Sequence, residues 1–278
     1  MIDFNELETQ LDRELKNDWD SLVDRFRQIG PAAVAFSGGV DSGLLCAAAY
    51  RALGSRMLAV TVSSPVESLG DVSSARVLAS QVGFALRVVD YDDLNNPKFV
   101  ENPPDRCYHC KLARFTTLLS MAAAEGYPCL VEGSNADDVQ DYRPGRRAVA
   151  ETGALSPLME LGLGKTRIRA LARALGLAVW DRPSAPCLAT RFPYGSEVTY
   201  TGLRQVADGE KFLLEMGFNS VRVRHHGSLA RLEVDPAEIE RLVSQRLQVS
   251  EFFKGLGFIF VSVDLAGYRT GSLNEVLK

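Results

Sequence analysis

We expect an α/β fold, in which helices cover both faces of a parallel β-sheet, followed by a small α+β domain. Three observations predict it. Short apolar segments typical of buried strands alternate with segments of helical periodicity, as in βαβ units. A glycine-rich turn, SGGVDS (37–42), joins the first expected strand to a long apolar helix. Beyond residue 196 the pattern changes to helix, hairpin, helix and strand.

The first 185 residues are expected to form the parallel sheet and its helices. A helix over residues 4–29 comes first, because apolar side chains recur there at helical spacing. The expected strands are AAVAF (32–36), MLAVTV (57–62), FALRVVDY (84–91) and CLVEG (129–133). The expected helices between and after them lie at 43–53, 72–82, 108–125 and 165–176. Because crossover helices lie on the faces of such a sheet, we expect both faces to be buried.

Residues 186–278 are expected to form the second domain, which we interpret as α+β and similar to a ferredoxin fold. Its expected elements are a helix at 197–217, a hairpin of SVRVRHH and LARLEV, a helix at 236–245 and a strand at 257–265. We therefore expect two domains, 1–185 and 186–278.

Composition and charge exclude several classes of protein. The 31 Lys and Arg residues against 35 Asp and Glu give a formal net charge of −4, which argues against a general nucleic-acid binder. No apolar run approaches the ~20 residues that span a bilayer, and the first residues lack the apolar core of a secretory signal. We expect a cytoplasmic protein, in which the odd count of five cysteines is not a disulfide framework.

The turn after the first strand has the residues of a phosphate-binding loop. Its members are Ser37, Gly38, Gly39, Val40, Asp41 and Ser42. The two glycines allow a close backbone approach, and successive N–H groups at the start of the next helix would point at an anion. Asp41 would repel phosphate unless it holds a Mg²⁺ ion that bridges to the nucleotide. A plain βα turn with capping Ser and Asp is the alternative, but the complete motif favours phosphate.

A second loop, EGSNADD (132–138), directly follows the fourth strand. Gly133 and Asn135 are expected at the carboxyl edge of the sheet beside the phosphate loop, because the ends of parallel strands meet there. Asp137 and Asp138 are expected to reach Mg²⁺. The alternative is an Asx turn that starts a helix.

The phosphate loop resembles the PP-loop of the ATP pyrophosphatases, which adenylate a substrate and release pyrophosphate. This resemblance implies a doubly wound parallel sheet with ATP across the carboxyl ends of the strands. It also implies that the end of the second strand, Val62–Ser63, contacts adenosine.

Three further stretches are similar to the LarE family of ATP-dependent sulfur transferases, which build the nickel-pincer nucleotide of lactate racemase. The first two are NPPDRCYHCK (102–111) and EGSNADDVQDYRPGRRA (132–148). The third covers residues 156–195, beginning with SPLMELGLGK (156–165) and ending with PCLATRFPYG (186–195). The resemblance implies that ATP adenylates a carboxylate of a pyridinium dicarboxylate mononucleotide. Sulfur then replaces AMP and leaves a thiocarboxylate.

Cys187 is the expected sulfur nucleophile, with Lys111, Arg191 and Arg182 as neighbours that would favour its thiolate. In one branch of the family the matching cysteine gives up its own sulfur. This chain adds Cys107-x-x-Cys110, and the three cysteines together would hold three irons of a [4Fe–4S] cluster, leaving the fourth iron free for a transferable sulfide. Zinc, a redox CxxC and three unrelated thiols remain alternatives.

The expected substrate-binding residues are Lys111, Arg191, Arg222, Arg224 and Glu233. The family resemblance implies that the strand face of Arg222 and Arg224 meets the substrate phosphate and carboxylates, with Glu233 on the partner strand orienting an arginine. A solvated strand face is the alternative. Arg222 and Arg224 alternate on one strand and so share a face, where guanidinium groups suit phosphate and carboxylates. A homo-oligomer is expected. A tRNA thiolase, an amidating synthetase and a nucleotide-binding regulator are the alternative functions, and the charge argues against the first.

Overall fold

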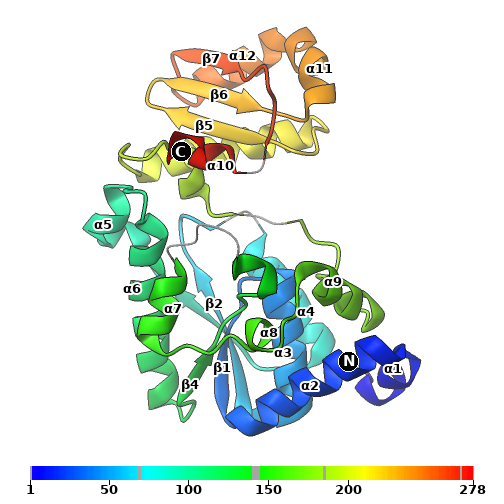
Figure 1. Cartoon of the computed structure of the whole chain (residues 1–278). Coiled ribbons are helices and arrows are strands. Elements are labelled where there is room, and N and C mark those ends of the chain that lie inside the picture. Colours follow the sequence, from blue (N-terminus) through cyan, green and yellow to red (C-terminus); the bar gives the residue numbers. More distant parts are fainter. Residues whose placement is uncertain (1, 68–69, 140–144, 184–185, 270, 278) are drawn as a thin grey trace. The chain divides into compact units, whose positions relative to one another are not determined.

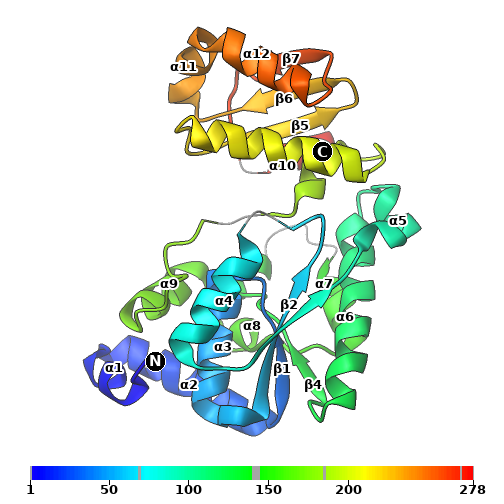
Figure 2. The ribbon, with the colours of Figure 1, turned by 180° about the vertical axis from the view of Figure 1, so that it is seen from behind.

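The computed structural model describes residues 2–67, 70–139, 145–183, 186–269 and 271–277 (Figures 1 and 2). The chain forms two compact units. The first comprises Met1–Ser64, Gly70–Tyr91 and Cys107–Ala185, and the second Pro65–Leu69, Asp92–Arg106 and Pro186–Lys278. The expected domains, 1–185 and 186–278, remain a prediction, because the second unit also takes two segments from within the first 185 residues.

The first unit contains a parallel four-stranded sheet in the order β3-β2-β1-β4, which confirms the predicted fold class. Its strands are β1 (Ala32–Ala35), β2 (Met57–Ser63), β3 (Leu86–Asp90) and β4 (Cys129–Val131). Its helices are α1 (Phe4–Gln10), α2 (Arg13–Ile29), α3 (Val40–Leu53), α4 (Asp71–Val82), α6 (Arg106–Ala124), α7 (Gly145–Thr152), α8 (Pro157–Glu160) and α9 (Lys165–Ala174).

Helices cover both faces of this sheet, as Figures 1 and 2 show. Alternate residues of β1 enter two different apolar clusters, because successive side chains of a strand point to opposite faces. Ala32 and Val34 pack in the cluster formed with α2, α3, α4 and α9. Ala33 packs in the cluster formed with α6 and α7. The strand order reverses between β1 and β4, which creates a switch point at their carboxyl ends.

The N-terminal segment is two helices, so the expected single helix over residues 4–29 was wrong. The break falls at Leu11–Asp12, where Leu11 has extended backbone angles. The Asp12 side chain then accepts a bond from Leu15 N at 2.9 Å and caps α2. An N-cap carboxylate satisfies a free amide of the first turn and so starts a new helix within a continuous apolar pattern.

The second unit contains the expected hairpin and a third strand. Antiparallel β5 (Arg222–His226) and β6 (Leu229–Glu233) pair, and β7 (Phe260–Val263) lies parallel to β6. Its helices are α5 (Pro97–Val100), α10 (Tyr200–Glu215), α11 (Ile239–Ser244) and α12 (Arg246–Gly255). Short 3₁₀ helices include Leu188–Arg191 and Ser272–Leu277.

The comparison with a ferredoxin fold was wrong in one respect. The described residues of this unit form three strands in the order β5-β6-β7, whereas a ferredoxin-like sheet has four. The segment before α10 is rich in proline, which removes ladder donors, and no named strand occurs in its described residues.

None of the helices in the described part of the chain is long and apolar enough to cross a membrane. The cytoplasmic location stays a prediction.

Candidate active site

The phosphate loop lies between β1 and α3, at the switch point of the sheet. The Ser42 hydroxyl folds back across the loop, accepting from Ser37 N at 3.2 Å and lying 3.0 Å from Ser37 Oγ. Gly39 caps α3 without a side chain, so the first amides of that helix are not satisfied by a capping group. Val40 and Asp41 begin the helix. The sequence therefore folds here into an open, amide-lined helix start suited to phosphate.

Gly38 is the position where this loop cannot tolerate a side chain. Its φ is +75°, and a Cβ atom would lie 2.5 Å from Asp71 O and 2.8 Å from Arg182 Nη1. Arg182 donates to Gly38 O at 2.6 Å and to Asp71 Oδ1 at 2.5 Å. Arg182 thus fixes the direction of the Gly38 carbonyl. Because the carbonyl and the N–H of one peptide group point in opposite directions, the following amide points away from Arg182.

The loop after β4 meets the phosphate loop. A Cβ atom on Gly133 would lie 3.2 Å from Ser42 N, so the two backbones are in contact. Asn135 Nδ2 lies 3.5 Å from Asp41 Oδ2. Asp138 Oδ2 accepts from Asn135 N at 3.1 Å and thereby shapes this loop. The expected meeting of the two loops at one edge is confirmed, while their binding of ATP and Mg²⁺ stays a prediction.

Asp41 has the chemistry of a cation ligand. Its Oδ1 atom is buried and has no hydrogen-bond partner among the described residues. Its Oδ2 atom pairs with Lys165 Nζ. Lys165 is the first residue of α9, and its N–H donates to Asp137 Oδ2 at 2.7 Å. A buried carboxylate oxygen without a partner is costly, and a magnesium ion bound beside phosphate would satisfy it.

Lys111 is held by a buried carboxylate. Its Nζ donates to Glu132 Oε2 at 2.9 Å, and Glu132 is only 4% exposed. Glu132 also accepts from Ser134 N, Ser134 Oγ and Ser156 Oγ. Burial acts to raise the pKa of Glu132, but Lys111 and the two hydroxyls outweigh it and hold that pKa below its usual value. This network fixes the ammonium group of Lys111 at the end of β4.

The end of β2 adjoins the same edge of the sheet. Val62 and Ser63 are half-buried, and Ser63 O accepts from Tyr91 N at 2.9 Å. Their predicted contact with adenosine is not tested by these bonds.

The three candidate cysteines belong to two units. Cys107 and Cys110 lie one turn apart at the start of α6, in the first unit, where Cys107 is exposed and Cys110 half-buried. Cys187 lies in the second unit, directly before the 3₁₀ helix Leu188–Arg191, and is half-buried. Within the parts of the chain that the structure describes, no three Cys, His, Asp or Glu side chains are grouped to hold a metal ion. The cluster therefore stays a proposal.

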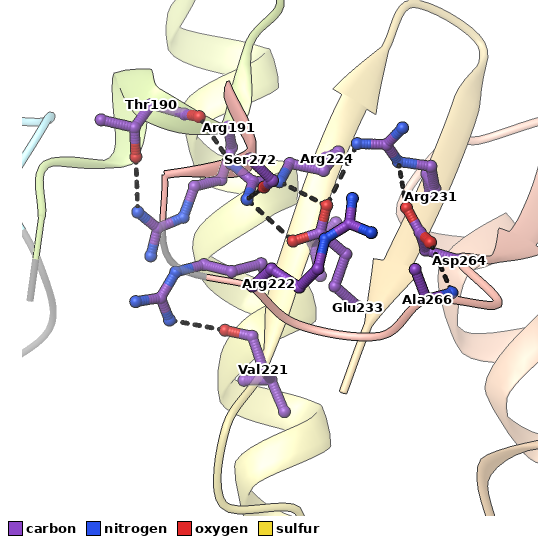
Figure 3. A network of polar contacts seen from close by, with 12 residues as sticks. Thr190, Arg191, Val221, Arg222, Arg224, Arg231, Glu233, Asp264, Ala266 and Ser272 are labelled. Atoms are coloured by element: carbon purple, nitrogen blue, oxygen red, sulfur yellow. Dashed lines mark hydrogen bonds and ion pairs between the residues drawn. The ribbon is translucent and has the colours of Figure 1, made fainter. Parts of the chain in front are cut away.

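Arginines and carboxylates form a network in the second unit (Figure 3). Arg224 is 7% exposed and forms a two-pronged pair with Glu233, with Nε–Oε1 at 2.9 Å and Nη2–Oε2 at 2.8 Å. Arg191 is 2% exposed and pairs in the same way with Glu210, while its Nη1 donates to Pro186 O at 2.9 Å. Arg191 thus supports the segment that carries Cys187.

Arg222 differs from these two arginines. Its Nη1 donates only to Val221 O, at 2.6 Å, and no ion pair among the described residues joins it to a carboxylate. Burial, followed by the charge of Arg191, lowers the pKa of Arg222. The strand alternation predicted for Arg222 and Arg224 is present, and Arg222 is the one with donors left for a ligand.

Four residues at the site were not singled out as site residues from the sequence. They are Asp71, Glu132, Lys165 and Arg182. One signal for Lys165 was available: a cation in the first turn of a helix is unfavourable next to the helix dipole, so it needs another reason to be there. The expected nearness of Arg182 to Cys187 stays a prediction, and its guanidinium bonds the phosphate loop. Its contacts join residues more than 100 positions apart, which spacing does not reveal.

Comparison with known proteins finds two relatives that match this chain over almost their whole length and one that matches it in part. No family model matches it. An uncharacterized protein of Synechocystis sp. is 40% identical over 266 residues, covering 95% of this chain and 99% of the relative. A pyridinium-3,5-bisthiocarboxylic acid mononucleotide synthase of Lactiplantibacillus plantarum is 35% identical over 258 residues, covering 92% and 94%. A tRNA-specific 2-thiouridylase of Zymomonas mobilis is 28% identical over 197 residues, covering 58% and 53%.

The parallel sheet, its switch point and the SGGVDS loop define a nucleotide-binding protein of the PP-loop ATP pyrophosphatase class. Within that class the chain belongs to the LarE family of ATP-dependent sulfur transferases, as its full-length similarity to the synthase shows. The predicted family is therefore confirmed.

Proposed function

We propose that this enzyme adenylates a carboxylate of a pyridinium dicarboxylate mononucleotide and replaces AMP with sulfur. The carboxylate oxygen attacks the α-phosphorus of ATP, and pyrophosphate leaves. A sulfur nucleophile then attacks the acyl carbon, and AMP leaves with the electron pair of the broken C–O bond. The product is a thiocarboxylate, of the kind named for the synthase of Lactiplantibacillus plantarum.

The observation that carries this proposal is the buried Asp41 oxygen beside Lys165, at an amide-lined helix start. An anion bound by these amides and a cation bound by Asp41 would neutralise each other. In this arrangement Ser37–Ser42, Gly133 and Asn135 hold the nucleotide, Val62–Ser63 contact adenosine, and Asp41 with Asp138 holds Mg²⁺. When bound, Mg²⁺ supplies charge neutralisation at the departing pyrophosphate.

The test is pyrophosphate release from ATP with the pyridinium dicarboxylate mononucleotide, with tRNA as a second arm. We expect release with the mononucleotide and none with tRNA. Asp41→Asn should reduce the rate at least a hundredfold, because it removes the carboxylate charge that a metal needs. Asp18→Asn is the matched control, since Asp18 pairs with Arg167 instead of the loop. Release that depends on tRNA alone would refute the proposed substrate.

We also propose that sulfur comes from a [4Fe–4S] cluster held by Cys107, Cys110 and Cys187. Cys107 and Cys110 fit two ligands, because their spacing puts both thiols on one side of the first turn of α6. Within the second unit, Arg106, the residue before Cys107, donates to the carbonyl of Ala189, two residues after Cys187, at 2.9 Å. When bound, such a cluster would supply a replaceable sulfide.

The cluster has a direct test. The protein is purified without oxygen, and iron and acid-labile sulfide are measured per chain, in wild type and in Cys107→Ala. We expect about four of each, lost in the variant. Cys129→Ala is the control, because Cys129 lies in β4 outside the proposed site. Absence of iron after anaerobic reconstitution would refute the cluster, and mass spectrometry of Cys187 would then test the sacrificial alternative.

We propose, finally, that the enzyme is a homo-oligomer joined through its second unit. Among the residues that the structure describes, β7 pairs only with β6, and Phe260 on it is 63% exposed. An apolar edge strand of this kind favours pairing with another chain. Light scattering should give a mass above one chain, and Phe260→Lys should lower it. A monomeric wild type would refute this proposal.

A further inference from the structure

The arginine network of the second unit carries one positive charge that nothing in it balances. Arg191 pairs with Glu210, Arg224 with Glu233, and Arg231 with both Glu233 and Asp264. Arg222 has no such partner among the described residues. Glu233 lies opposite Arg222 across the hairpin and the charge of Glu210 also acts on Arg222, but both carboxylates are paired with other arginines. A half-buried guanidinium without an ion pair is costly, so this position suits an anionic ligand.

The C-terminal strap, which we define as residues 264–269 and 271–275, runs along this network, from Asp264 beside Arg231 to Ser272 beside Arg224 (Figure 3). The Tyr268 ring stacks on Arg222, with 4.9 Å from the guanidinium carbon to the ring centroid. Ser272 Oγ accepts from Arg224 Nη2 at 2.9 Å. The two predicted substrate-binding arginines of β5 thus each receive a contact from the strap.

The strap is itself anchored within the second unit. Tyr268 N donates to Val234 O at 2.8 Å, which fixes the ring beside the end of β6. Gly267, at φ +65°, allows this approach, because a Cβ atom there would lie 2.7 Å from Val234 O. Further along, Tyr194 donates to Asn274 Oδ1 at 2.9 Å. The strap therefore presents a fixed ring and a fixed hydroxyl.

These contacts leave the arginines oriented but not neutralised. The face of an aromatic ring attracts a cation through its quadrupole and carries no net charge. A carboxylate in the place of Tyr268 would orient Arg222 equally well but would cancel the charge that an incoming phosphate needs. The serine hydroxyl likewise accepts one bond from Arg224 without adding charge.

We propose that Tyr268 and Ser272 are positioning residues that aim Arg222 and Arg224 at the phosphate group of the mononucleotide. This inference rests on the proposed function, since it takes the substrate from there. It extends the substrate site from β5 to the C-terminal strap, about forty residues later in the sequence.

The test compares the mononucleotide with the corresponding nucleoside, which lacks the phosphate. The concentration that gives half-maximal pyrophosphate release is measured for both, and for ATP. We expect Tyr268→Leu to raise this concentration roughly three- to thirtyfold for the mononucleotide, with the maximal rate, the nucleoside value and the ATP value unchanged. Tyr268→Phe keeps the ring and should restore the wild-type value. Ser272→Ala should raise the mononucleotide value roughly two- to tenfold.

Arg269→Ala is the control within the strap, because Arg269 pairs with Glu275 and contacts neither arginine. An unchanged mononucleotide value in both folded variants would overturn the inference, as would an equal rise for the nucleoside. If Tyr268→Leu does not fold, Ser272→Ala decides by the same comparison. A wild type that releases no pyrophosphate with the mononucleotide refutes the proposed function instead. Calorimetric titration of the mononucleotide into the variants then tests the strap without turnover.

Discussion

Lys165 joins the start of α9 to the carboxylate of the phosphate loop. Its ammonium pairs with Asp41, and its amide donates to Asp137, so both ends of the residue are fixed. Binding of a cation at Asp41 would release the ammonium toward the phosphates, where a lysine acts as a point charge. A cation at a helix start, unfavourable on its own, is explained by this use.

We expect Lys165→Ala to lower the rate of pyrophosphate release at limiting ATP by about ten- to a hundredfold, the loss of a charge-assisted hydrogen bond. The measurement is the initial rate against ATP concentration. Arg167→Ala is the control, because Arg167 lies on the same helix but pairs with Asp18. Equal rates for the two variants would contradict a role of Lys165 at the phosphates.

Glu132 gives the site a dependence on pH. Its pKa is lowered in the folded protein, so its stabilising effect is present above the unfolded value of about 4.3 and is lost as the pH falls through the folded pKa. We expect Glu132→Gln to reduce the free energy of unfolding by about 1–3 kcal/mol at pH 7, because Lys111 loses its buried charged partner. Below about pH 4 the difference should shrink.

Urea unfolding of wild type and Glu132→Gln, at pH 7 and below about pH 4, measures the difference in their free energies of unfolding. The matched control is Glu125→Gln, since Glu125 pairs with Arg87 at the surface and such pairs contribute under about 1 kcal/mol. A difference between wild type and Glu132→Gln that grows in acid would contradict the assigned charge state of Glu132.

At the scale of elements, the phosphate loop depends on backbone shape more than on side chains. Gly38 and Gly54 both have positive φ, at +75° and +58°, but only Gly38 has atoms within 4 Å of a Cβ position. We expect Gly54→Ala to lower stability by about 1–3 kcal/mol, because φ +58° with ψ −125° is a conformation that residues with a Cβ rarely adopt, and to leave ATP use unchanged. Gly38→Ala must move Asp71 or Arg182 as well, and should abolish pyrophosphate release. Thermal unfolding measures the stability of both variants, and the pyrophosphate assay measures their activity. Pyrophosphate release by Gly38→Ala would contradict the role of this glycine in the loop.

The sequence predicted the strands better than the helix ends and the network residues. The strands β1, β2 and β4 are short apolar runs, and β3 keeps an apolar core of valines between exposed Arg87 and Asp90. All four lie where they were expected, because they alternate with helical segments as in βαβ units. The break at Asp12 was missed because capping overrides an apolar pattern that continues through it. Glu132 and Tyr268 were missed as site residues, and so was the bond of Arg182 to the phosphate loop, because these contacts join distant segments, which periodicity does not encode.

At the scale of the whole molecule, the chain passes between its two units several times. Asp92–Arg106 lies between β3 and α6 in sequence but belongs to the second unit. Asn102, at φ +54° and fully buried, donates to the carbonyls of Pro193 and Ser196, at 2.7 and 3.0 Å. Gly195 N donates to Asn102 O at 2.9 Å in return. The folding of this inserted segment therefore depends on residues almost a hundred positions later.

A fragment of residues 1–185 should for this reason be ordered in one part and not in another. It keeps every strand of the parallel sheet but loses the carbonyl partners of Asn102 and the Ala189 carbonyl that Arg106 bonds. We expect hydrogen exchange at residues 92–106 to be at least a hundredfold faster in the fragment than in the full chain. In the full chain, local opening of this segment must break the bonds of Asn102 and Arg106, whereas in the fragment these bonds are absent and opening costs less free energy. Exchange in α3 serves as the internal control and should stay slow in both, since its buried face packs against α2 and α9 within the first unit. Equal protection of residues 92–106 in the two proteins would mean that this segment folds with the parallel sheet, and that the division of the chain near residue 185 describes its folding after all.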